Sequence, residues 1–145
     1  AVTGVANPRV YGYYKVAGAS EPGTYRWGFA STITSAGGIV RYTGAAGLDA
    51  PASKASGSSA TSGTVPGVTT SAGNAMLVGC MGINSGATTI TITGPPAMSE
   101  VWDLGVKRHE LDDALQATPG ASGDKTWSFS AGREWAGWLA ALRPL

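Results

Sequence analysis

Large and small side chains alternate along three segments of the chain, residues 24–33, 88–93 and 125–131. Because a period of two puts successive side chains on opposite faces of an extended backbone, this pattern predicts three half-buried β-strands. Each strand collects its large side chains on one face, and we expect those faces to meet in one shared core. The side chains are Trp27, Phe29, Ile90, Ile92, Trp127 and Phe129.

Weaker strand patterns fill much of the remaining chain. They cover residues 10–17, 38–43, 64–70 and 98–104, with turn-forming Gly, Pro and Asn residues between segments. Residues 106–117 fit a short helix and a strand-plus-turn equally well. About nine short strands at roughly 10-residue spacing predict an all-β antiparallel sandwich, jelly-roll-like, with little or no helix.

Two further segments, 75–83 and 134–142, are apolar on both faces. The outer face of a sandwich strand normally meets water and carries polar groups. An apolar outer face needs a cover, which a loop or another chain supplies. We therefore expect an interface at which at least one of Met81, Trp135 and Trp138 becomes buried only in an oligomer.

Residues 50–63 differ from the rest because they hold no residue larger than Lys54 and show no periodicity. Such a segment is typical of a mobile loop. We predict that it connects two strands within one domain that spans residues 1–145. The chain begins with Ala1 rather than Met, so we expect it to be processed or to be part of a longer protein.

Small residues dominate the composition, since Gly, Ala, Ser and Thr supply 74 of the 145 residues and Leu, Ile, Val and Phe only 25. So few large aliphatic residues would indicate disorder if the net charge were high. The net charge is only +1, and five Trp and five Tyr residues provide large core side chains. The composition therefore favours a folded domain built around aromatic residues.

The distribution of charge and hydropathy argues against two classes of partner. Lys and Arg are scattered along the chain rather than clustered, which is not the pattern of a nucleic-acid-binding surface. No run approaches the roughly 20 apolar residues that a membrane span needs. We expect neither a nucleic-acid partner nor membrane insertion.

The chain has one histidine and one cysteine, and both have ordinary structural interpretations. His109 lies in a charge run of mixed sign over residues 107–113, which is typical of a solvated edge. Cys80 lies in the middle of the most apolar segment, where a thiol is usually a small buried hydrophobe. A single cysteine also excludes an internal disulfide and a cysteine-rich metal site.

The few carboxylates show no catalytic or metal-binding arrangement. Glu100 and Asp103 lie in one predicted strand at an odd separation, so we expect them to point to opposite faces. Asp112 and Asp113 lack the spaced oxygen ligands of a calcium loop. We predict no catalytic residue, no metal site and no cofactor.

The aromatic residues leave two interpretations open. The favoured one is that they fill the core in place of the missing Leu and Ile, since each buries roughly 150–250 Å². The other is that Tyr11 and Tyr13, which share a face with Lys15 in the predicted strand 10–17, form an exposed platform for a glycan.

Six short runs of sequence carry a resemblance to a known group of modules. The runs are residues 13–22 (YYKVAGASEP), 25–29 (YRWGF), 37–44 (GGIVRYTG), 74–79 (NAMLVG), 98–103 (MSEVWD) and 141–144 (ALRP). In this order they span nearly the whole chain and resemble C-terminal modules of phage virion proteins (decoration or tail-fibre) and of bacterial surface proteins. The resemblance implies a jelly-roll or concanavalin-like β-sandwich, and it brings no catalytic residues with it.

The chain departs from these modules at its start. Similar modules usually have further strands upstream of the Tyr-Tyr-Lys run, ending in a Pro-Pro-x-Gly-Trp turn. This chain begins about a dozen residues before that run. We therefore expect a neighbouring chain, or an earlier part of the same protein, to complete the sheet.

Three classes of function remain, in decreasing order of expectation. The first is a non-enzymatic structural or assembly module, above all a phage virion protein such as a capsid decoration or tail fibre. Its partners are other copies of itself or neighbouring virion subunits. The second is an extracellular carbohydrate-binding or adhesion module with a cell-surface glycan as partner, and an enzyme comes third. The first two classes place the protein on a virion surface or outside the cell.

Overall fold

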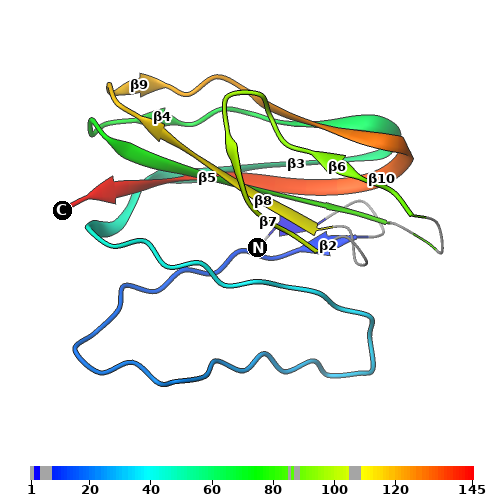
Figure 1. Ribbon diagram of the computed structural model, residues 1–145, viewed down its shortest axis with the longest axis horizontal. Helices are drawn as coiled ribbons and strands as arrows, with labels where there is room; N and C mark the ends of the chain where they lie inside the picture. The colour runs from blue at the N-terminus through cyan, green and yellow to red at the C-terminus, as the bar shows by residue number, and fades with distance from the viewer. Residues whose placement is uncertain (1, 4–7, 85, 87–88, 105–108) are drawn as a thin grey trace.

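Two long antiparallel strands frame the body of the computed structural model, which describes residues 2–3, 8–84, 86, 89–104 and 109–145 (Figure 1). They belong to one sheet with a further strand attached at the side. The strands of the main path, in spatial order, are β3 (Ala45–Val65), β10 (Lys125–Pro144), β5 (Ala75–Ile83), β8 (His109–Gln116) and β7 (Ser99–Asp103), and β6 (Ile92–Thr93) also pairs with β10. All of these pairings are antiparallel.

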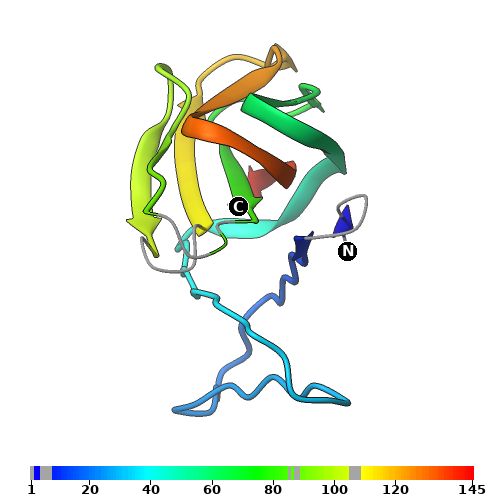
Figure 2. The same cartoon turned by 90° about the vertical axis from the view of Figure 1, so that its right-hand side faces the viewer.

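Short strands form two more antiparallel pairs. They are β1 (Val2–Thr3) with β2 (Arg9–Val10), and β4 (Thr69–Thr70) with β9 (Gly120–Ala121). Seen from the end, the strands curl around a common interior in a sandwich-like body (Figure 2). The described residues contain no helix, so the predicted all-β antiparallel class is confirmed.

The sequence pattern locates several strands of the body, and the bounds of 75–83 agree with the structure. The segments 75–83 and 98–104 correspond to β5 and β7. The segments 125–131 and 134–142 are one strand, β10, whose pairing with β3 shifts register between Ser128 and Arg133. A bulged strand can bend while it keeps its backbone partners, and this explains why one element carries two different patterns.

Three other segments are shorter or broken. The predicted strand 64–70 is divided into the end of β3 and β4, and Pro66, which has no backbone donor, lies in the interruption. Of residues 88–93 only Ile92 and Thr93 form a strand, and Thr88 lies outside the described residues. The ambiguous segment 106–117 is a strand from His109 to Gln116, with 106–108 outside the described part.

The prediction of a loop over residues 50–63 is wrong, because these residues lie inside β3. Their pairing partner is β10, and two of the small residues make room for a tryptophan of that strand. A Cβ atom on Gly57 would lie 2.7 Å from Nε1 of Trp135, and one on Gly63 would lie 2.6 Å from Cδ2 of the same ring. Period two is present here, but small residues on both faces conceal it from a hydrophobic pattern.

The interior of the body is filled by large side chains from β3, β5, β6 and β10 and from the segments next to them. Four of the six predicted core residues are confirmed there, namely Ile90, Ile92, Trp127 and Phe129. The fully buried Trp127 pairs across the sheet with Gly63, and a Cβ on Gly79 would lie 2.8 Å from its ring. The other two predicted members, Trp27 and Phe29, lie elsewhere, as described below.

A second apolar cluster lies on the outer face of β5, β8 and β10. Its buried members are Val10, Val78, Cys80, Leu111 and Ala136, and the partly buried residues packed on it are Val40, Tyr42, Met76, Trp102, Trp138 and Leu142. The apolar outer face that the sequence predicted is therefore present. Val10, Val40 and Tyr42 of the same chain cover part of it.

Residues 11–44, here called the arm, contain no strand. The arm leaves the body after β2, runs along one side at a distance from the sheet, and returns into β3 (Figures 1 and 2). The predicted strands 24–33 and 38–43 are therefore wrong, as is 10–17 apart from Val10 in β2. A strand needs a hydrogen-bonded neighbouring strand, and within the described chain residues 11–43 have none; the backbone is bonded where Gly44 accepts from Leu145 at 2.9 Å, next to β3.

Candidate functional site

Two buried carboxyl groups lie side by side in the interior of the body. Glu110 and Asp112 are two residues apart on β8, so both side chains point to the same face of the sheet. Each exposes about 1% of its surface. Asp112 Oδ2 accepts a hydrogen bond of 2.6 Å from Nε1 of Trp127, whereas neither carboxyl oxygen of Glu110 has a partner. Gly94 closes the site, since a Cβ there would lie 2.2 Å from Asp112 Oδ1.

The neighbouring strand β7 brings two more carboxylates to the same face. Glu100 pairs in register with Asp112, and Asp103 pairs with Glu110, with a register shift between Glu100 and Trp102. The expectation that Glu100 and Asp103 point to opposite faces is therefore wrong, because the irregularity changes the alternation. Burial raises the pKa of Glu110, and the charges of Asp112, Asp103 and Glu100 raise it further.

A thiol and an imidazole meet on the opposite face of the sheet. Cys80 Sγ and His109 Nε2 share a hydrogen bond of 2.8 Å, and the ring of Trp102 meets the imidazole edge-on at 5.0 Å between centroids. Burial raises the pKa of the Cys80 thiol and lowers the pKa of His109 to about 4. Both groups are therefore neutral near pH 7, whereas a nucleophilic cysteine needs its thiolate form.

These positions correct one sequence interpretation and confirm another. His109 does not lie on a solvated edge, because its ring packs between Cys80 and Trp102. Lys107 and Arg108, from the same charge run, lie outside the described residues. Cys80 is buried, as its apolar neighbours predicted. The spacing of Glu110 and Asp112 would have revealed their shared face if residues 106–117 had been assigned as a strand.

The buried polar groups have the residue types of acid–base or thiol chemistry but no access for a substrate. Glu110, Asp112 and Cys80 are each about 1% exposed. Within the described residues, no group of three or more His, Cys, Asp or Glu side chains is arranged to hold a metal ion. The site therefore has the features of a structural polar cluster inside the body.

The arm carries most of the exposed apolar surface. Nine of the twelve large hydrophobic side chains that are exposed in the described part of the chain belong to it. They are Tyr11, Tyr13, Tyr14, Val16, Tyr25, Trp27, Phe29, Ile33 and Ile39. Exposed apolar groups gathered in one segment are typical of a surface that binds a partner.

Glycines anchor both ends of the arm against tryptophans of the body. A Cβ on Gly12 would lie 2.9 Å from the ring of Trp138, and one on Gly38 would lie 2.6 Å from the ring of Trp102. Close to the second contact, the Tyr42 hydroxyl donates a hydrogen bond of 2.9 Å to Asp113 Oδ2. The middle of the arm has no comparable contact to the body.

Glu21 organises a bend within the arm. Its carboxylate accepts hydrogen bonds from Lys15 Nζ at 2.7 Å, from the backbone of Gly18 at 2.6 Å and from the Tyr25 hydroxyl. These donors, the lysine first, lower the pKa of Glu21 to about 2. The residues just before 26–33 are therefore held in a defined turn even though the segment is solvated.

The two candidate glycan-binding residues lie at the start of the arm. Tyr11 and Tyr13 stack on each other with ring centroids 6.4 Å apart and planes 12° from parallel. Both rings are exposed, and Tyr13 is 75% exposed. The structure thus brings these two residues together outside the core.

The three candidate interface residues occupy different positions. Met81 and Trp135 are buried in the interior cluster of a single chain, so no second chain is needed to cover them. Trp138 is half-buried in the outer cluster, below Gly12, and its indole nitrogen has no hydrogen-bond partner. Trp138 is thus the member of the trio that remains near the surface.

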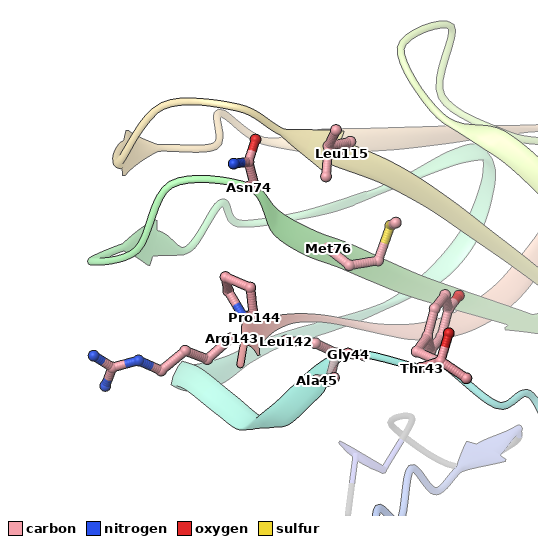
Figure 3. Close-up of a pocket in the computed structure, with 10 residues that line it drawn as sticks. Thr43, Gly44, Ala45, Asn74, Met76, Leu115, Leu142, Arg143 and Pro144 are labelled. Carbon is pink, nitrogen blue, oxygen red and sulfur yellow. The ribbon is translucent and has the colours of Figure 1, made fainter.

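A small cavity of about 190 Å³ lies where the arm returns into β3 (Figure 3). Met76 and Leu115 border it from β5 and β8, and Leu142 and Pro144 border it from β10. The side chain of Arg143 extends away from this group. Sites for small-molecule ligands usually enclose about 300–1,000 Å³, so this hollow offers little room for a substrate.

Comparisons with protein-family models, with curated proteins and with solved structures find no match to this chain. Among the described residues there is also no helix with the length and apolar character to cross a membrane.

Proposed function

We propose that the protein is a non-enzymatic structural module that assembles on the surface of a particle or cell. The observation that carries this proposal is the concentration of exposed aromatic and aliphatic side chains in the arm, outside a body that has its own core. Burial of Glu110, Asp112 and Cys80 supports the non-enzymatic part, because the groups suited to catalysis are enclosed.

The particle that we favour is a phage virion, with the module as a capsid decoration or tail-fibre component. The support for this assignment is the resemblance of six sequence runs to virion modules, and three of those runs, 13–22, 25–29 and 37–44, lie in the arm. Inspection of the genes beside the one that encodes this chain tests the assignment. Capsid and portal genes are expected there, and a neighbourhood of unrelated enzymes would contradict it.

Assembly itself is tested on the full chain by light scattering coupled to size exclusion, from about 1 µM to about 1 mM. A defined oligomer with neighbouring copies is the expected result. A chain that remains monomeric over this range, and that binds neither virion components nor cell surfaces, would overturn the proposed function.

The stacked pair Tyr11 and Tyr13 favours a second candidate, a glycan-binding or adhesion module. Exposed aromatic rings are suited to stacking on the apolar face of a sugar, and these two are held parallel. Binding to a glycan array should disappear in the Tyr11→Ala and Tyr13→Ala variants. Tyr14→Ala is the matched control, because Tyr14 is an exposed neighbour outside the stacked pair. An array without any bound glycan would exclude this candidate.

A further inference from the structure

Residues 24–33 of the arm have the pattern of a strand but no strand partner among the described residues. Tyr25, Trp27, Phe29 and Ile33 alternate with Arg26 and small residues, yet the segment is solvated and unpaired. Trp27 and Phe29 are 57% and 56% exposed. Because large apolar side chains are stabilised when they leave water, the solvated arm is expected to bind an apolar surface.

Among the described strands, β7 forms one edge of the sheet. This strand pairs with β8 on one side and is the last strand in the order of the sheet. An edge strand presents unpaired backbone donors and acceptors that another strand can use. Among its five residues, Ser99–Asp103, are two carboxylates and no cation.

The two faces beside this edge differ in chemistry. Trp102, in register with Leu111, lies on the outer face and belongs to the outer apolar cluster. Glu100 and Asp103 lie in register with Asp112 and Glu110 and so belong to the acidic inner face. A strand that binds this edge therefore needs one apolar face and one basic face.

Residues 24–33 meet both requirements. Their odd-numbered face presents Tyr25, Trp27 and Phe29, which suit the neighbourhood of Trp102. Their even-numbered face presents Arg26, which suits Glu100 and Asp103. The whole arm carries three cations, Lys15, Arg26 and Arg41, against the single carboxylate Glu21. The charges of the arm and the edge are thus complementary.

We propose that residues 24–33 of one copy add as a strand to the β7 edge of a second copy of this chain. This inference rests on the proposed assembly function and specifies its contact. The arm is anchored to its own body at Gly12 and Gly38, and its middle lies away from its own sheet (Figures 1 and 2). Residues 24–33 are therefore positioned to contact another molecule rather than the β7 edge of their own chain.

Each copy donates one arm and accepts one, so the contacts close as a reciprocal dimer or a ring. Tyr25, Trp27 and Phe29 are 43%, 57% and 56% exposed, so about half of the roughly 150–250 Å² that each ring can bury is still available to a partner. Two copies of this trio, together with the surfaces that they cover on the two β7 edges, bring a reciprocal dimer to roughly 1,000 Å², which is the size that a specific interface needs. The backbone hydrogen bonds of the added strand contribute in addition.

The test uses light scattering of the full chain together with hydrogen exchange of residues 24–33. The wild type should be oligomeric, with slow exchange in this segment. The double variant Trp27→Ser/Phe29→Ser should be monomeric, with the unfolding midpoint of the body unchanged. Leu115→Ser is the matched control, because Leu115 is an exposed hydrophobic residue of the body.

A charge exchange tests the specific edge. Arg26→Glu alone and Glu100→Arg alone should each weaken association by about tenfold or more, and the combination should restore most of the loss. Failure of the combination to restore association would overturn the β7 assignment.

The remaining outcomes separate this inference from the proposed function. An oligomer that Trp27→Ser/Phe29→Ser leaves intact would overturn the arm contact but not the assembly function. A monomer in which residues 24–33 exchange slowly would show that the arm folds onto its own chain, which also overturns the second-copy contact. A monomer with fast exchange in the arm would overturn the second-copy contact, and it would overturn the proposed function as well if the chain also binds neither virion components nor cell surfaces.

Discussion

The chain contains the same aromatic pattern twice, once in the arm and once in the body. Trp27-Gly28-Phe29 and Trp127-Ser128-Phe129 each place two aromatic rings on one face of an extended segment. In the body, Trp127 and Phe129 are 0% and 6% exposed, whereas their counterparts in the arm are more than half exposed. Local sequence therefore does not decide which pair is buried.

The partners around each segment make the difference. Trp127 and Phe129 lie on β10, which pairs with β3, and Phe129 also lies in register with Ile92 of β6. The indole of Trp127 donates to Asp112, so its polar atom is satisfied inside the core. Residues 24–33 have no neighbouring strand in the described chain. Alternation specifies which side chains share a face, and the availability of a second strand determines whether that face is buried.

The largest expected effect is the loss of the buried tryptophan of the body. Trp127→Ala should lower the free energy of unfolding by about 3–5 kcal/mol, because it opens a cavity and leaves the buried Asp112 without its indole donor. Denaturant unfolding measures this change. Nearly unchanged stability in a variant that still unfolds cooperatively would contradict the assignment of Trp127 to the core.

The second comparison uses glycines of the two regions. Gly63→Ala should cost about 1–3 kcal/mol, because its Cβ would overlap the ring of Trp135. Gly28→Ala in the arm is the matched control, since a Cβ there meets nothing within 4 Å. Thermal unfolding of both variants checks the prediction, and equal midpoints would show that β3 does not pack closely on Trp135.

A third prediction concerns pH, because burial and neighbouring carboxylates raise the pKa of Glu110 from 4.5 to about 8. In the unfolded chain, the Glu110 carboxyl loses its proton above about pH 4.5. In the folded chain, the same carboxyl stays protonated until the pH is higher. The contribution of Glu110 to the free energy of unfolding should therefore fall as pH rises from about 4.5 to about 8. His109, whose pKa burial lowers from 6.5 to about 4, acts in the opposite direction below about pH 6.5, so the net fall is expected between about pH 6.5 and pH 8. Denaturant unfolding at a series of pH values measures this slope.

Glu110→Gln should flatten this dependence, because the amide does not ionise. Glu21→Gln provides the contrast from the arm, where hydrogen bonds from Lys15, Tyr25 and Gly18 lower the pKa of the carboxyl instead. Its variant should leave the slope between pH 5 and pH 8 unchanged. A slope that Glu110→Gln does not alter would mean that another group controls it.

The smallest expected effect is that of the exposed tryptophan. Trp27→Ala should change the free energy of unfolding of the monomeric full chain by less than about 0.5 kcal/mol, as is usual for a solvated side chain. The measurement is denaturant unfolding of dilute protein. A loss comparable to that of Trp127→Ala would mean that Trp27 belongs to the core of a single chain.

The sequence predicted the all-β class, the strands β5 and β7 and four of six core residues, because alternating large and small side chains determine these features. It failed for 50–63, where small residues on both faces conceal a strand that is shaped to hold Trp135. It failed for 24–33 in the opposite sense, because this segment has the alternation of a strand but no partner strand in the part of the chain that the structure describes. The Glu110 and Asp112 pair could not be found without assigning 109–116 as a strand.

Strand β10 follows β3, β5 and β6 along the chain and pairs with all three. During synthesis, these three strands are made before the strand that they all pair with, so the native sheet forms only after β10 has been made. Folding that depends on such distant contacts is slow, and strands that are still unpaired make the partly folded chain prone to aggregation. β3 is the first of the three to be made, so it is without its partner for the longest time. Its 21 residues include only Leu48 and Val65 as large aliphatic side chains. Its Ala, Ser and Gly content thus keeps the nascent chain soluble during this interval, because segments that lack large hydrophobic residues associate weakly with one another.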